Sequence, residues 1–283
     1  GRMRTVEFAS SGAAVSAIGQ GTWYFEQLGR ADAVRALQHG VDCGLTHVDT
    51  AEMYGDGVAE EIIGEALADR RDEIFLVSKV LPWNASYDGT IEACESSLRR
   101  LRTDRLDCYL LHWPGSYPLD ETFAAMAQLE QDGKIRSFGV SNFDVDDLEE
   151  AVAVVGQGRL ACNQVLYHLD QRAIEHAVLP WCADHDISIV GYSPFGHSAF
   201  PGTRSSGWPA LQAVAEKHGA SERQIALAFL GRADNVLLIP KSSSLAHITA
   251  NAAAAAIQLD PDDIARLDEG FPRGRKPSGL PML

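Results

Sequence analysis

The chain has 283 residues, of which 46% are hydrophobic and 22% charged, as in an ordinary globular protein with one large core or two small ones. Its formal net charge of −15 leaves no broad basic surface for a nucleic-acid backbone, so nucleic-acid binding is disfavoured. No apolar run approaches the roughly 18 residues of a membrane span, and no basic start precedes an apolar leader, so we expect a cytoplasmic protein with no membrane partner.

Short apolar runs typical of strands alternate along the chain with amphipathic runs typical of helices. Residues 4–19 predict a β-hairpin around a Ser-Ser-Gly turn. The strands that follow are predicted at 17–22, 45–50, 73–80, 106–113, 135–142, 161–167, 188–194 and 235–242. The helices between and after them are predicted at 30–44, 58–70, 89–101, 119–133, 144–156, 172–186, 208–219, 222–232 and 245–259. An extra helix at 260–270 and a Pro/Gly-rich tail end the chain.

Eight strand–helix units predict an α/β fold, a closed (β/α)8 TIM barrel with an N-terminal β-hairpin and extra C-terminal helices. Most strands are continuous apolar runs, as expected of parallel strands buried on both faces, and such barrels have about 250 residues. The alternative fold is an open doubly wound sheet, which usually carries the motif G-x-G-x-x-G after its first strand. Gly19 and Gly21 have no third glycine and no helix directly after them, which favours the barrel. No linker divides residues 1–283, so a single domain is predicted.

Polar side chains collect where the predicted strands end, which is where the active sites of such barrels lie. Asp49 and Tyr54 follow the second strand, Lys79 ends the third, and His112 ends the fourth. Each alone could be a cap, a surface residue or a packing residue. Four such groups at one barrel mouth are costly to desolvate unless they are used, so we interpret them as a site.

The chemistry of these four residues follows from their pairing. Asp49 would keep Lys79 charged, and Lys79 would lower the pKa of Tyr54 from its reference of about 10. Tyr54 could then donate a proton to a carbonyl oxygen, and His112 could donate a hydrogen bond to the same oxygen. The five cysteines and the histidines lack a zinc spacing, and no G-x-S-x-G motif occurs, so no metal is expected and a cofactor must supply the reaction.

The chain resembles the aldo-keto reductase superfamily, in its bacterial-type form, over nearly its whole length. The motifs that carry the resemblance are "GTW" (21–23), "HVDTAEMYG" (47–55), "VSK" (77–79), "LLHWP" (110–114), "GKIRSFGVSNF" (133–143), "NQVLYH" (163–168), "GYSPFG" (191–196) and "IPKS" (239–242). The resemblance implies the catalytic tetrad Asp49, Tyr54, Lys79 and His112. His47 and Glu52 are not implicated, and we interpret them as packing or loop residues.

The resemblance also implies a nicotinamide cofactor, with NADP(H) expected ahead of NAD(H). The nicotinamide end would contact Gly21, Thr22, Trp23, Asp49, Ser141, Asn142, Gln164 and Tyr192. The pyrophosphate would contact Ser193, Pro194, Phe195 and Gly196, and the adenosine end would contact Ile239, Pro240, Lys241, Ser242, Ser243, His247 and Asn251. His247 stands where many members have Arg, which weakens the expected recognition of a 2′-phosphate.

The expected partner is a small-molecule carbonyl substrate, reduced from an aldehyde or ketone to an alcohol by hydride from nicotinamide C4. Its pocket would be lined by Trp23, Tyr24, Tyr54, Trp83, His112 and Trp113, which suits apolar or aromatic carbonyls. The short loop after the seventh strand and the short tail predict an open pocket. Two alternatives remain: a cofactor-binding redox sensor or scaffold with slow turnover, and a Schiff-base lyase that uses Lys79. No pattern in the chain indicates an oligomeric state.

Overall fold

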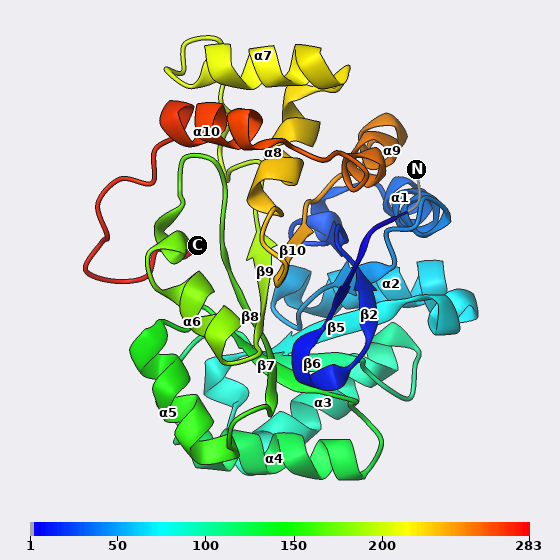
Figure 1. Ribbon diagram of the computed structural model, residues 1–283. Helices are drawn as coiled ribbons and strands as arrows, with labels where there is room; N and C mark the ends of the chain where they lie inside the picture. The colour runs from blue at the N-terminus through cyan, green and yellow to red at the C-terminus, as the bar shows by residue number, and fades with distance from the viewer. Residues whose placement is uncertain (1–2) are drawn as a thin grey trace.

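The eight predicted strands form one closed parallel barrel in the computed structural model, which describes residues 3–283 (Figure 1). The order of the strands around the barrel follows their order along the chain. A parallel bridge between Ile18 and Leu238 joins the first strand to the last, and the Gly21 N–H donates to the Pro240 carbonyl at 3.0 Å. The strands are β3 (Gln20–Gly21), β4 (His47–Asp49), β5 (Phe75–Val80), β6 (Cys108–Leu111), β7 (Phe138–Ser141), β8 (Leu160–Leu166), β9 (Ser188–Tyr192) and β10 (Val236–Ile239). The barrel prediction is confirmed.

The predicted N-terminal hairpin covers one end of the barrel. Its strands β1 (Thr5–Glu7) and β2 (Ala14–Ser16) pair antiparallel, and the turn between them contains the 3₁₀ helix Ala9–Ser11. Phe8 and Val15 are buried and pack with residues of the barrel interior such as Leu110 and Leu237. The hairpin therefore closes the end where the strands begin, and only the end where they finish is left for a site.

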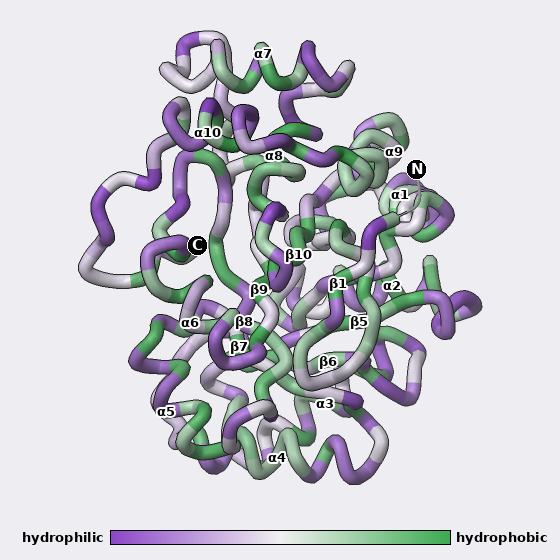
Figure 2. Tube along the Cα trace, viewed as in Figure 1, coloured by the Kyte–Doolittle hydropathy of each residue, from purple (hydrophilic) through white to green (hydrophobic). Residues whose placement is uncertain are grey.

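Helices surround the barrel and bury one face each against it. They are α1 (Arg30–Asp42), α2 (Val58–Leu67), α3 (Tyr87–Leu101), α4 (Leu119–Gln131), α5 (Val145–Val155), α6 (Val178–Asp184), α7 (Trp208–His218), α8 (Glu222–Leu230), α9 (Leu245–Ala254) and α10 (Pro261–Gly270). Hydrophobic and hydrophilic residues alternate along α4 and α5 in Figure 2, as expected of amphipathic helices with one buried face. Among residues 3–283, no helix is long and apolar enough to cross a membrane.

The helix predicted at 172–186 is shorter in the structure. A 3₁₀ turn occupies Ala173–Glu175, and α6 begins only at Val178. The turn is fixed by the fully buried Arg172, whose guanidinium donates to the Glu175 carboxylate at 2.8 Å. Pro180 then lies in the first turn of α6, where its missing N–H costs no hydrogen bond. A buried ion pair and a proline thus set the start of this helix.

The alanine-rich helix predicted at 245–259 also ends early, at Ala254. The next helix, α10, has its own cap: the Asp260 side chain accepts from the backbone N–H of Asp263, and Asp263 bonds back to the N–H of Asp260. Ile257 packs against the core between the two helices. The chain leaves α9 because this cap and this contact require a turn, although alanine favours a longer helix.

Candidate active site

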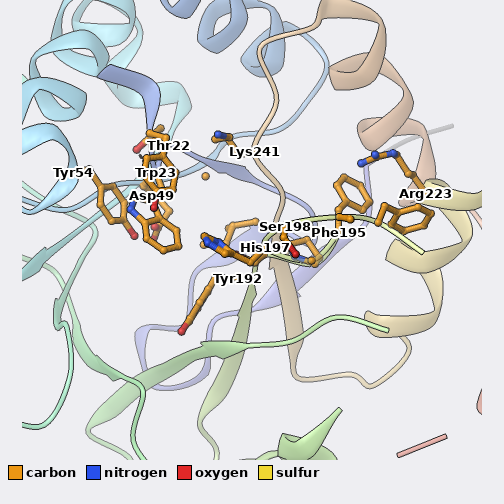
Figure 3. A pocket seen from close by; sticks show the side chains of 18 residues that line it. Thr22, Trp23, Asp49, Tyr54, Tyr192, Phe195, His197, Ser198, Arg223 and Lys241 are labelled. Atoms are coloured by element: carbon orange, nitrogen blue, oxygen red, sulfur yellow. Dashed lines mark hydrogen bonds between the residues drawn. The ribbon is translucent and has the colours of Figure 1, made fainter. Parts of the chain in front are cut away.

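Three of the four predicted catalytic residues form one hydrogen-bonded cluster at the end of the barrel where the strands finish. Two of them, Asp49 and Tyr54, are labelled in Figure 3. The Lys79 ammonium donates to Asp49 Oδ1 at 2.6 Å, to the Thr50 carbonyl at 2.8 Å and to the Tyr54 hydroxyl at 2.9 Å. Asp49 lies opposite Val77 in the β4–β5 register, and Lys79 follows two residues later on the same face of β5. The register of two strands therefore brings the cation and the carboxylate together.

Tyr54 reaches this cluster from a tight turn after β4. The 3₁₀ segment Tyr54–Gly57 contains Gly55 at φ 58°, and a Cβ at Gly55 would lie 2.6 Å from Glu26 side-chain atoms. Glycine at this position therefore allows both the left-handed backbone and the close approach that aim the Tyr54 ring into the barrel mouth. The motif "HVDTAEMYG" supplies the strand, the carboxylate and the turn in nine residues.

Burial and charge set the protonation state of the cluster. Burial opposes the charge of Lys79, but the Asp49 carboxylate and the Tyr54 hydroxyl outweigh it, so the pKa of Lys79 is raised above its ordinary value. Burial also raises the pKa of Tyr54 above 10, because it outweighs the opposing effect of Lys79. The prediction that Lys79 brings the Tyr54 pKa below its reference is therefore wrong for this structure. Tyr54 keeps its proton at neutral pH.

His112 lies beside Tyr54, with 5.8 Å between the ring centroids. Burial, and then the charge of Lys79, hold the pKa of His112 well below 6.5, so the imidazole is neutral at neutral pH. Its Nδ1 has no hydrogen-bond partner among the described residues. A neutral imidazole can donate one hydrogen bond to a substrate oxygen through its ring N–H, but that N–H is a far weaker acid than an imidazolium.

A second polar cluster connects these residues to β7, β8 and β9. Gln164 Nε2 donates to Asp49 Oδ2 at 2.7 Å, and the Ser141 hydroxyl donates to the Gln164 carbonyl at 2.8 Å. The amide of Asn142 donates to the His112 carbonyl at 3.1 Å and accepts from the Tyr192 hydroxyl at 2.9 Å. These amides and hydroxyls line a small cavity of about 20 Å³ together with Trp23, Met53, Tyr54, His112, Tyr192 and Leu283. The structure therefore brings the predicted nicotinamide contacts next to the catalytic cluster.

A larger cleft of about 310 Å³ continues from this cavity along the barrel mouth (Figure 3). The predicted cofactor contacts that line it are Gly21, Thr22, Trp23, Asp49, Tyr192, Ser193, Pro194, Phe195, Gly196, Ile239 and Lys241. Tyr24 lines the cleft as well, with the Lys241 ammonium 5.4 Å from its ring centroid. Pro240, Ser242, Ser243, His247 and Asn251 do not line it; His247 is exposed on α9, and Asn251 is buried.

The loop after β9 and the C-terminal tail both contribute residues to the mouth of the barrel. Phe195, His197 and Phe200, from the loop between β9 and α7, line the large cleft. The tail returns to the small cavity, where the Leu283 N–H donates to the Tyr192 hydroxyl at 3.0 Å. The loop and the tail thus form part of the walls of the two cavities, and the openness of the substrate pocket stays a prediction.

Two predicted substrate residues lie apart from both cavities. Trp83 is 63% exposed and packs edge to face on Trp113 at 5.5 Å between ring centroids. Trp113 in turn packs on His112 at 5.0 Å. This aromatic pair supports His112 from outside the small cavity in the structure. His47 is fully buried against Phe8 and Phe75, as expected of a packing residue.

Several lining residues were missed by the sequence reasoning: Met53, His197, Ser198, Ala199, Phe200, Arg223 and Leu283. His197 to Phe200 lie in a Gly/Ser/Pro-rich loop with no periodic signal. Arg223 stands alone at the start of a helix, and Leu283 follows a tail with no pattern. Only the three-dimensional path of the loop and tail brings them to the mouth.

Comparison with known proteins agrees with this geometry. A model of the aldo/keto reductase family matches residues 17–270. The methylglyoxal reductase YeaE of Escherichia coli (strain K12) is 42% identical over 284 aligned residues, which cover 100% of both chains. Two crystal structures of an aldo-keto reductase from Klebsiella pneumoniae, one in complex with NADP and acetate and one with NADPH, are each 44% identical over 100% of both chains. Their TM-scores are 0.93 and 0.92. The resemblance indicated by the motifs is confirmed, and the chain belongs to the aldo/keto reductase family.

Proposed function

We propose that this chain is an NADP(H)-dependent reductase that converts small aldehydes and ketones to alcohols, with Tyr54 as the proton donor. The observation that carries the proposal is the contact of 2.9 Å between the Lys79 ammonium and the Tyr54 hydroxyl, with Asp49 at 2.6 Å on the other side of Lys79. All of residues 1–283 are assigned to one catalytic domain in this proposal.

The residues of the mouth fit a nicotinamide dinucleotide. At one end, the amide and hydroxyl groups of Ser141, Asn142 and Gln164 can exchange hydrogen bonds with a carboxamide, beside the partly buried ring of Tyr192. Towards the other end, Lys241 and the loop that begins at Ser193 offer a cation and backbone N–H groups for phosphates. The Klebsiella pneumoniae relatives bind NADP and NADPH, which supports the same cofactor here. When bound, the nicotinamide supplies a hydride to the carbonyl carbon.

The chain supplies the proton and the positioning for this reduction. The neutral imidazole of His112 lines the small cavity and can hold the carbonyl oxygen by a hydrogen bond from its ring N–H. As that oxygen gains negative charge, it becomes more basic than the Tyr54 phenolate and takes the hydroxyl proton. The Lys79 ammonium, whose raised pKa keeps it charged, then stabilises the phenolate at a distance of 2.9 Å. The C=O double bond thus becomes a C–O single bond, while a C–H bond forms from the hydride and an O–H bond from the Tyr54 proton, with no metal in the scheme.

The geometry at Lys79 speaks against the Schiff-base alternative. Its Nζ donates to three oxygens, and its raised pKa leaves no free lone pair to attack a carbonyl. Borohydride trapping of a carbonyl compound on Lys79 would revive that alternative.

The walls of the small cavity and one relative support a small substrate. The cavity lies beside Tyr54 and His112. Trp23, Met53 and Leu283 form apolar walls around it. Because a relative with 42% identity is a methylglyoxal reductase, we assign short 2-oxoaldehydes as the preferred class.

A panel of carbonyl compounds tests the proposal. Methylglyoxal, a short aliphatic aldehyde and a bulky aromatic ketone are assayed with NADPH and with NADH under multiple turnover. We expect the highest kcat/KM for methylglyoxal with NADPH. Binding of NADPH without more than one turnover on any substrate would instead support the redox-sensor alternative.

A further inference from the structure

One arginine of the large cleft has no role in the chemistry described above. Arg223 lies in the first turn of α8, and its side chain lines the cleft that also contains Lys241. Figure 3 shows Arg223 at one end of the cleft and Tyr54 at the other, with His197, Ser198 and Phe195 between them. Within residues 3–283, its guanidinium makes no ion pair with a carboxylate. It is therefore a cation held in a cleft without a protein counter-charge.

Two aromatic rings hold this guanidinium in place. Its central carbon lies 5.0 Å from the Phe195 ring centroid and 4.8 Å from the Phe200 ring centroid. Both rings come from the loop that covers the mouth and also line the cleft. The faces of aromatic rings attract a cation. The two rings lie nearly perpendicular to each other, with 5.9 Å between their centroids, and so restrict where the guanidinium can lie before any ligand binds.

The position of Arg223 on its helix is electrostatically unfavourable. It is the second residue of α8, where the partial positive charge of the helix N-terminus disfavours a cation. The neighbouring Gln224 donates to the Ala250 carbonyl on α9 at 2.9 Å, so the start of α8 lies against the helix that follows Lys241. The cleft therefore has two cations, Lys241 and Arg223, in a chain with a net charge of −15. Such a local positive field favours an anion.

The distance along the cleft indicates which anion. The pyrophosphate of a dinucleotide lies in the middle of the molecule, whereas a 2′-phosphate lies on the adenosine, far from the nicotinamide. Arg223 lies at the end opposite the Tyr54 cluster (Figure 3). A guanidinium also suits the bidentate geometry of a phosphate better than the imidazole of His247, which is exposed on α9 and does not line the cleft.

We propose that Arg223 is a specificity-determining residue that binds the 2′-phosphate of NADP(H), so that this cation, held against Phe195 and Phe200, selects NADPH over NADH. The inference rests on the proposed function, because it assumes that the nicotinamide lies at the Tyr54 end of the cleft.

Ligand titration of purified protein tests the inference without any turnover. Quenching of tryptophan fluorescence gives the Kd of NADPH, NADH, 2′,5′-ADP and 5′-ADP for wild type, Arg223→Gln and Arg223→Lys. Arg204→Gln is the matched control, because Arg204 is an exposed arginine near the same loop that does not line the cleft. We expect Arg223→Gln to raise the Kd of NADPH and of 2′,5′-ADP roughly 10- to 100-fold, the size of a charge-assisted hydrogen bond. The Kd of NADH and of 5′-ADP should change less than about twofold, and Arg223→Lys should be intermediate.

Three outcomes would overturn the inference. If NADPH and NADH weaken in parallel, Arg223 only holds the two phenylalanines. If 2′,5′-ADP and 5′-ADP weaken equally, it contacts the part that both share. If no Kd changes in Arg223→Gln while the wild type prefers NADPH, the 2′-phosphate is bound elsewhere and the proposed function still holds. A wild type that binds none of the four ligands would instead contradict the proposed function itself.

Discussion

Replacing Lys79 by methionine should remove activity and also destabilise the fold. The side chains of Lys79 and Asp49 are 0% and 1% exposed, so the charges are desolvated and depend on each other. Methionine fills a similar volume, but the Asp49 carboxylate keeps only the hydrogen bond from Gln164 at 2.7 Å. Breaking one side of a buried ion pair costs about 3–5 kcal/mol of unfolding free energy. At roughly 2 °C per kcal/mol for a chain of this size, Tm should fall by about 6–10 °C.

The double variant Lys79→Met/Asp49→Asn separates the charge effect from packing. It leaves no unpaired buried charge, so we expect it to regain more than half of the lost stability while staying inactive. Lys134→Met is the surface control: Lys134 is partly exposed and pairs with Glu95, and exposed pairs contribute at most about 1 kcal/mol. Urea unfolding and steady-state kinetics measure both quantities. A double variant no more stable than Lys79→Met, or a Lys79→Met with wild-type stability, would refute this reasoning.

Three further predictions concern pH and ligands. The kcat/KM for carbonyl reduction should stay constant from about pH 7 to pH 10, because burial raises the pKa of Tyr54 above 10 and holds the pKa of His112 well below 6.5. A pH–rate profile in which kcat/KM already decreases between pH 7 and pH 10 would contradict this. Fluorescence titration should show that Lys241→Ala weakens NADPH binding by about 1–3 kcal/mol and barely changes NADH binding. Equal affinities of the wild type for NADPH and NADH would show that Lys241 does not select NADPH. Burial opposes the charge of Glu175, but Arg172 and its other partners hold the pKa of Glu175 at about 2. The charged carboxylate therefore contributes its full stabilisation of the fold above about pH 4.5, and this contribution is lost as pH falls towards 2. The free energy of unfolding, measured by chemical denaturation from about pH 4.5 to pH 2, should fall in the wild type and fall less in Glu175→Gln. Equal dependence on pH in the two proteins would contradict this role of Glu175.

The barrel and the catalytic cluster could be predicted because each depends on local patterns that repeat. Short, largely apolar runs such as 73–80 and 106–113, alternating with amphipathic helical runs, favour buried parallel strands, and eight of them fit a closed barrel. The end of each strand then fixes where Asp49, Lys79 and His112 lie. Tyr54 could be predicted because it follows the strand that ends at Asp49 by only five residues, which keeps it near the same end of the barrel.

The rest of the site depends on long-range packing that leaves no local pattern. The balance between burial and the Lys79 charge, which raises the pKa of Tyr54, appears only once the depth of the ring is known. The tail from 271 to 283 has no periodicity, yet Leu283 reaches Tyr192. Arg223 is one of many arginines in the sequence, and only the folded loop brings Phe195 and Phe200 against it.

The central claim, hydride transfer from nicotinamide with proton donation by Tyr54, is tested most directly by isotope transfer. Wild type and Tyr54→Phe are incubated with methylglyoxal and NADPH carrying deuterium at both C4 positions, and the alcohol is analysed by mass spectrometry. We predict one deuterium on the former carbonyl carbon with wild type, and product formation slower by roughly 10²–10⁴-fold with Tyr54→Phe, although NADPH still binds. Product without deuterium, or a Tyr54→Phe variant with near wild-type turnover, would contradict the account.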